Sequence, residues 1–143
     1  DIYALHTLVA AMLAHVPEGA VRVLRDPTRG GLGTTLNEIA QQSKVGMLLQ
    51  EALIPVLPQV AGACELLGLD PLYIANEGKL VAIVAPEAAS AVLAAMRAHP
   101  LGLRATQIGL VSEDANYFVQ MSTNFGGRRV VDWLSGEPLP RIC

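Results

Sequence analysis

The chain has 143 residues, of which 52% are hydrophobic and 16% charged, and its formal net charge is −3. This composition is too apolar for a disordered chain and predicts one compact domain with a sizeable core. The slight negative charge without a basic run argues against nucleic-acid binding, and no apolar run is long enough to span a membrane, so we expect neither nucleic acid nor a membrane as a partner.

The first residue is Asp1 rather than methionine, which suggests a processed or truncated end of a longer protein. The two cysteines, Cys64 and Cys143, are too few for a disulfide framework. Neither the cysteines nor the three histidines show the close spacing of a metal site, so we expect no metal ligands. Cys64 is expected to be a small buried hydrophobe, and free thiols favour a cytoplasmic location.

In the first half of the chain, helices and strands are expected to alternate. Apolar residues at helical spacing predict a helix at 3–15, and a short apolar run predicts a strand at 21–24. A polar, glycine-bearing turn at 26–31 then leads into a helix of about ten residues. Residues 45–50 are expected to form the next strand.

The second half begins with a helix predicted at 58–67, because proline favours a first helical turn and glycine a helix end. Strands at 72–75 and 79–84 are expected to form a hairpin around the turn Asn76-Glu77-Gly78. Another helix is predicted from Pro86 to about residue 98. The remaining strands are expected at 105–111, 117–122 and 129–133.

This order of elements predicts an α/β (α+β) fold in which helices pack on a mixed β-sheet. We expect a folded domain at residues 1–134 and a flexible C-terminal tail at residues 135–143. Pro138 and Pro140 favour an extended tail, which at about 3.1 Å per residue reaches roughly 25 Å. The tail carries Cys143 at its end.

The segment DPTRGG, residues 26–31, is the first candidate ligand site. Glycines allow a ligand to approach the backbone, the N–H groups at a helix start attract anions, and Arg29 can grip a phosphate with two hydrogen bonds. The segment matches neither standard nucleotide-binding pattern, and a simple capped turn explains the same residues. Both interpretations stay open on spacing alone.

The second candidate is Glu77, which stands between Asn76 and Gly78 and is followed by Lys79. A carboxylate at a hairpin turn can serve as a general base if it is partly buried. Taken alone, these residues favour an ordinary exposed turn over a base, because turns are rich in such side chains.

The third candidate is the thiol of Cys143. A free thiol has a pKa of about 8.5, so part of it is the nucleophilic thiolate at cytoplasmic pH. A prenylation signal is excluded, because its cysteine stands fourth from the end. An accidental cysteine on a disordered end is the alternative, but an exposed thiol is a liability, which favours a function.

Three segments, RDPTRGGLGTTLNEIA, ACELLGLDPLYIANEGKLVAIV and the terminal PRIC, together resemble the C-terminal half of the hydrogenase maturation factor HypE family over nearly the whole chain. That family is similar to aminoimidazole ribonucleotide synthetase and selenophosphate synthetase. The resemblance therefore implies a PurM-like C-terminal domain. It also implies that ATP and Mg are bound mainly by an N-terminal domain that this sequence does not include.

The reaction implied by the resemblance is an ATP-dependent carbamoyl dehydration. The carbamoyltransferase HypF loads a carbamoyl group onto the terminal cysteine, and dehydration turns it into a thiocyanate. The cyano group then passes to iron on a HypC–HypD complex and becomes a ligand of [NiFe]-hydrogenase. The family resemblance also implies a full-length homodimer, and we expect this domain alone to be inactive.

The resemblance also implies roles for single residues. Cys143 matches the modified cysteine, and Glu77 matches a carboxylate that we expect to be the base, with a pKa raised by burial. Asn76 and Lys79 are expected to orient Glu77. Contacts with phosphate or with the tail are expected from Asp26, Thr28, Arg29, Gly30 and Gly31.

Two alternatives from other functional classes remain at this point. The domain can serve as a docking module that presents its tail to HypF and to HypC–HypD without catalysis of its own. It can also be a stand-alone ligand-binding α/β domain whose terminal cysteine carries nothing.

Overall fold

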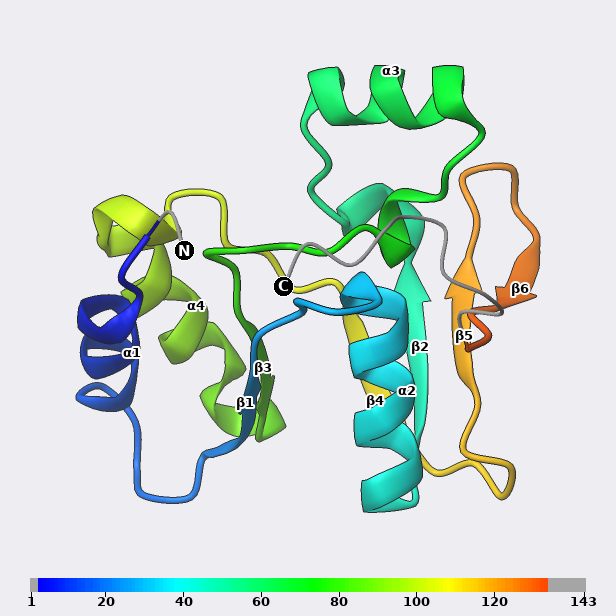
Figure 1. The fold of residues 1–143 in the computed structure, drawn as a ribbon. Helices are drawn as coiled ribbons and strands as arrows, with labels where there is room; N and C mark the ends of the chain where they lie inside the picture. The colour runs from blue at the N-terminus through cyan, green and yellow to red at the C-terminus, as the bar shows by residue number, and fades with distance from the viewer. Residues whose placement is uncertain (1–2, 134–143) are drawn as a thin grey trace.

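The computed structural model describes residues 3–133, whose arrangement is shown in Figure 1. The helices are α1 (His6–Leu13), α2 (Gly31–Ser43), α3 (Pro58–Leu67) and α4 (Ala89–Ala98). The strands are β1 (Val21–Arg25), β2 (Gly46–Gln50), β3 (Val81–Val84), β4 (Gly109–Ser112), β5 (Val119–Ser122) and β6 (Arg128–Val130). Four short 3-10 helices join them: η1 (Glu51–Leu53), η2 (Pro71–Tyr73), η3 (Pro86–Ala88) and η4 (Pro100–Gly102).

The strands divide between two sheets. The larger sheet has the order β4-β2-β5-β6, with β2 parallel to β5 and the other two pairs antiparallel. The smaller sheet pairs β1 with β3 in antiparallel fashion. In Figure 1, α2 lies over the larger sheet, while α1 and α4 lie together beside the smaller one. The expected α/β class, a mixed sheet flanked by helices, is confirmed.

The main core lies between α2 and the larger sheet, and the residue pattern of each element explains why. In β5, Val119 and Met121 are 0% and 1% exposed, whereas the alternate residues Gln120 and Ser122 are half-buried. This alternation with period two turns one face of the sheet toward α2. Helix α2 contributes Leu36, Ile39 and Ala40 to this core at helical spacing. The core residues are Leu36, Ile39, Ala40, Met47, Leu49, Leu72, Val119, Met121 and Val131.

Most helix predictions are confirmed, including the helix at 58–67, which begins at Pro58 and is capped by Gly68. Two of the last three strands begin later than predicted, at Gly109 and Val119, and the third ends earlier, at Val130. Cys64 is buried, as expected. The predicted boundary at residue 134 and the tail at 135–143 lie outside the described residues.

The predicted hairpin of 72–75 with 79–84 is wrong. Pro71–Tyr73 forms η2, because the Asp70 carboxylate caps it by accepting a hydrogen bond from the Leu72 N–H at 2.9 Å and Pro71 has a φ suited to a first helical turn. The second strand of the expected hairpin exists as β3, but it pairs with β1. Apolar residues before a turn therefore predicted a strand where a local cap forms a helical turn.

Candidate functional site

Two of the segments singled out in the sequence lie side by side. The Asn76 N–H donates a hydrogen bond to the Pro27 carbonyl at 3.0 Å, which joins the loop after β1 to the segment before β3. Figure 1 shows both segments running past the start of α2. The register Arg25↔Val81 places them at the same end of the β1–β3 pair. The structure thus brings residues 26–31 and 74–78 into one candidate site.

Gly31 makes this approach possible. A Cβ at this position would stand 2.5 Å from the Leu72 carbonyl oxygen and 2.6 Å from the Ile74 carbonyl oxygen. Its φ of +64° also lies in the left-handed region that favours glycine. The Gly31 N–H donates to the Thr28 carbonyl at 3.1 Å and closes the loop. The second glycine of DPTRGG is therefore required by packing as well as by backbone conformation.

Around this glycine turn the loop presents groups suited to an anion. Asp26 and Arg29 are exposed and Thr28 is half-buried, and no ion pair within residues 3–133 involves Arg29. Beneath Gly30, the buried hydroxyl of Thr34 has no hydrogen-bond partner among the described residues. The exposed Arg29 guanidinium is the group here that can bind an anion such as phosphate, whereas the Gly31 N–H is already bonded to Thr28 and the Thr34 hydroxyl is buried.

The second segment differs from its expected geometry. Glu77 is exposed, so the expected burial of this carboxylate is wrong. Lys79 is exposed as well. The half-buried Asn76 donates through Nδ2 to the Ile74 carbonyl at 2.9 Å, in addition to its N–H bond with Pro27. Its described bonds therefore hold the two backbone segments together rather than orient Glu77.

Two polar residues near this site, Asn37 and Tyr73, were not predicted from the sequence. Asn37 is 5% exposed, and its Nδ2 donates to the carbonyls of Gly33 at 2.9 Å and Val131 at 2.8 Å. The Tyr73 hydroxyl donates to the Asp132 carbonyl at 2.8 Å. An amide within the apolar face of α2 was the available signal for Asn37, because a buried polar group needs partners.

The environment of Tyr73 is tightly packed. A Cβ on Gly33 would stand 2.7 Å from Tyr73 Cε1, so the helix backbone lies directly against the ring. Burial raises the pKa of Tyr73 above its usual 10.0, and the nearby Asp70 carboxylate raises the pKa further. The phenol therefore stays protonated at neutral pH and keeps its role as a donor to Asp132.

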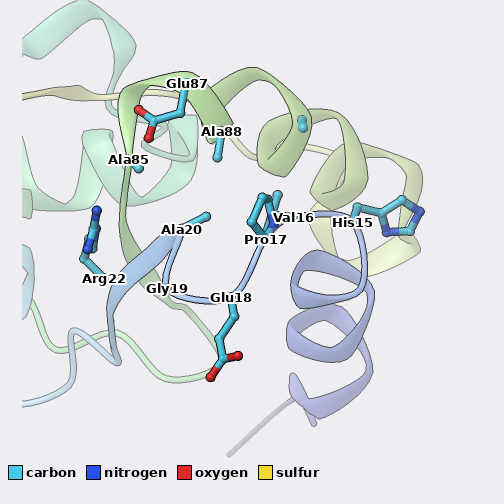
Figure 2. A pocket seen from close by; sticks show the side chains of 11 residues that line it. His15, Val16, Pro17, Glu18, Gly19, Ala20, Arg22, Ala85, Glu87 and Ala88 are labelled. Atoms are coloured by element: carbon cyan, nitrogen blue, oxygen red, sulfur yellow. The ribbon is translucent and has the colours of Figure 1, made fainter.

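A cavity of about 280 Å³ lies elsewhere, at the Val21↔Val84 end of the smaller sheet. Figure 2 shows its lining, in which the side chains of Glu18, Arg22 and Glu87 do not converge on a common point. This cavity therefore does not look like a catalytic site. Cys143 lies outside the described residues. Of the helices within residues 3–133, none combines the length and the apolar character that a membrane crossing requires.

Comparison with known proteins reveals close relatives. The carbamoyl dehydratase HypE of Cupriavidus necator is 73% identical over 143 residues, which cover 100% of this chain and 40% of that protein. A crystal structure of the hydrogenase maturation protein HypE in complex with ATP matches with a TM-score of 0.84 and 46% identity, over 94% of this chain and 42% of that chain. A crystal structure of a HypE–HypF complex matches with a TM-score of 0.86 and 38% identity, over 93% and 42%.

These matches confirm the resemblance to HypE proteins, and the chain spans 40% of the length of the C. necator relative. The family described as "AIR synthase related protein, C-terminal domain" matches residues 1–122, which is most of the sequence. This match confirms the PurM-like fold expected from the sequence. The chain therefore belongs to the family of AIR synthase related proteins, as a C-terminal domain.

Proposed function

We propose that this chain is the C-terminal domain of a HypE-type hydrogenase maturation protein that dehydrates a carbamoyl group on Cys143 to a thiocyanate. The 73% identity to a carbamoyl dehydratase supports the reaction, and the terminal Pro-Arg-Ile-Cys supports the attachment point. For the site, the supporting observation is the bond from the Asn76 N–H to the Pro27 carbonyl. It brings the segment with Glu77 next to the loop with Arg29.

Each residue has a chemical task in this proposal. The sulfur of Cys143 carries the carbamoyl group. The Glu77 carboxylate accepts one N–H proton as the amide oxygen is phosphorylated, releases it to solvent, and accepts the second as the C–O bond breaks and phosphate leaves. ATP, when bound, supplies the phosphoryl group that makes the amide oxygen a good leaving group. Arg29, Thr28 and the backbone of Gly30 bind phosphate, and Asp26 lies beside them. The net change is the loss of one water from the carbamoyl group.

The exposure of Glu77 agrees with a base that acts on a tethered substrate. An exposed carboxylate can be reached by a group carried on the tail. Arrival of the tail and of the N-terminal part of the protein supplies the enclosure that residues 3–133 do not provide around Glu77. Asn76 keeps this segment against the phosphate-binding loop, while Lys79 stands two residues beyond Glu77.

The wider setting follows from the same proposal. The full-length protein is a cytoplasmic homodimer in which the N-terminal part holds most contacts to ATP and Mg, so residues 1–134 alone do not catalyse the reaction. HypF loads the tail at residues 135–143, and the HypC–HypD complex receives the cyano group. The crystal structure of a HypE–HypF complex supports HypF as the loading partner.

The decisive experiment is the mass of the C-terminal peptide from the full-length protein co-expressed with HypF. A carbamoyl adduct on Cys143 is expected without ATP turnover, and a species lighter by one water is expected after it. The Cys143→Ala variant should show neither species. Thiocyanate formation by that variant would end the proposal.

A second candidate function is a docking module without catalysis of its own. The HypE–HypF complex favours it, as does helix α3, whose residues Leu66 and Leu67 are 85% and 67% exposed. A pull-down of HypF with the 143-residue chain separates the two functions. Binding by this chain, together with full-length protein that never loses water from its adduct, would favour the docking module.

A further inference from the structure

The chain leaves its last described strand through a firmly held junction, residues 131–133. Val131 is 0% exposed, and its N–H donates to the Val119 carbonyl at 2.8 Å. Its own carbonyl accepts a hydrogen bond from Asn37 Nδ2 at 2.8 Å. The next carbonyl, that of Asp132, accepts one from the Tyr73 hydroxyl at 2.8 Å. Two side chains from separate elements thus bind consecutive carbonyls.

Asn37 has a specific reason to be polar. A buried amide costs free energy unless its hydrogen bonds are made, and an apolar residue would suit this face of α2 equally well for burial. Its two described bonds reach the carbonyls of Gly33, on its own helix, and Val131, at the junction. The bond to Val131 spans 94 residues of sequence, so the amide links α2 to the junction rather than serving the helix alone.

Tyr73 makes the equivalent link from η2. Its ring lies against Gly33 of α2, and its hydroxyl reaches Asp132. The Arg129–Asp70 ion pair, at 2.7 Å, joins β6 to the residue that caps η2 and so flanks the same junction. Such a surface pair contributes at most about 1 kcal/mol, so the direct bonds to the junction carry more of its placement.

The two anchors lie close in the chain to the two segments that form the candidate site. Asn37 lies in α2, whose first turn follows the loop with Arg29. Tyr73 stands three residues before Asn76, which bonds to that loop, and four before Glu77. The junction is therefore tied to the site from both sides.

We propose that Asn37 and Tyr73 are positioning residues that set where the tail starts relative to Glu77 and the phosphate-binding loop. This inference rests on the proposed carrier role of Cys143. Cys143 is the tenth residue after Trp133. At about 3.1 Å per residue, ten residues can reach at most roughly 31 Å, so the point where they start limits which surfaces the thiol can contact.

The physical effect is one of effective concentration. A tethered group meets its target at a local concentration that falls as the tether lengthens beyond the span it must bridge. Loss of the Tyr73 hydroxyl releases Asp132 and lengthens the tether from ten to about twelve residues, whereas Val131 stays bonded to Val119 and Asn37. The intramolecular dehydration then slows, whereas the affinity for ATP does not change, because neither anchor belongs to the phosphate-binding loop.

The test uses full-length protein that HypF has carbamoylated and that is then mixed with ATP for a single turnover. Tyr73→Phe removes the hydroxyl and keeps the ring on Gly33. We expect the loss of water from the adduct to slow by roughly 1.3-fold, from the −3/2 power of the tether length, with an unchanged KM for ATP. Tyr117→Phe, a matched loss of a hydroxyl from a half-buried tyrosine before β5, should react at the wild-type rate.

Asn37→Ser is the second variant, because serine keeps a shorter polar group on α2. If this variant does not fold, Tyr73→Phe alone still tests the positioning role. A wild-type rate for Tyr73→Phe, or a slower rate accompanied by a higher KM for ATP, overturns the positioning role. If wild-type protein forms no thiocyanate at all, the proposed function itself fails. The two failures are therefore distinguishable.

Discussion

Gly31 shows at the level of one residue how packing and function coincide. Its missing Cβ lets the backbone of α2 lie against the carbonyls of Leu72 and Ile74. This approach places the loop with Arg29 next to the segment with Glu77. The identity of one small residue thereby controls whether two segments that are distant in sequence share a site.

Replacement of Gly31 by alanine should lower the free energy of unfolding by more than about 1–3 kcal/mol, because a left-handed φ and a backbone clash both oppose a Cβ. Urea denaturation measures this loss. Gly19→Ala is the matched control, since Gly19 also has a positive φ, +77°, but nothing within 4 Å of its Cβ position. An equal loss in the two variants would show that backbone strain, not the close approach, limits position 31.

Glu77 carries the second prediction at this scale. If its carboxylate accepts the amide protons, Glu77→Gln should keep the carbamoyl group on Cys143 but lose water roughly 10²–10⁴-fold more slowly. Mass spectrometry of the C-terminal peptide over time gives both quantities. Glu65→Gln, which alters an exposed carboxylate on α3, should leave the rate unchanged. Normal turnover by Glu77→Gln would remove the base assignment.

At the level of elements, η2 connects most parts of the site. Asp70 caps it, Tyr73 ends it, and the chain continues directly to Asn76 and Glu77. Because the expected strand is replaced by this short helical turn, the Tyr73 ring points to α2 and its hydroxyl to the end of the larger sheet. The element that sequence reasoning assigned wrongly is therefore the one that links helix, sheet and loop.

The raised pKa of Tyr73 gives this element a pH dependence. A phenol that holds its proton more firmly in the folded chain contributes stability that is complete below its unfolded pKa of 10.0 and lost as the pH rises through its folded pKa. The free energy of unfolding should therefore fall above pH 10.0 more steeply in wild type than in Tyr73→Phe. Parallel denaturation profiles of the two proteins would contradict this expectation.

At the level of the whole molecule, one core between α2 and the larger sheet supports the site. Truncation of Met121, which is 1% exposed, to alanine should cost roughly 2–5 kcal/mol through lost burial and the cavity left behind. Typical domains have only about 5–15 kcal/mol of stability, so the variant should unfold at much lower urea. Leu66→Ala, at a position that is 85% exposed, should change little. Equal free energies of unfolding for Met121→Ala and Leu66→Ala would show that Met121 does not belong to the main core.

Much of this fold could be predicted from the chemistry of residues that are close in the sequence. Proline at the start and glycine at the end bound α3, and the period of two in β5 marks a half-buried strand. In the loop after β1, glycine, threonine and arginine predict either a capped turn or an anion site. Each of these signals depends on neighbours within a few positions, so no knowledge of the rest of the molecule was needed.

The other features of the fold and of the candidate site depend on contacts between residues that are far apart in the chain. The partner of β3, the exposure of Glu77 and the anchoring of residues 131–133 by Asn37 and Tyr73 all depend on segments far apart in the chain. The Asn37–Val131 bond alone spans 94 residues. No local pattern predicts such a pair, because an asparagine and a backbone carbonyl can each bond to many other groups. Only the packing of α2 on the sheet brings these two within hydrogen-bonding distance.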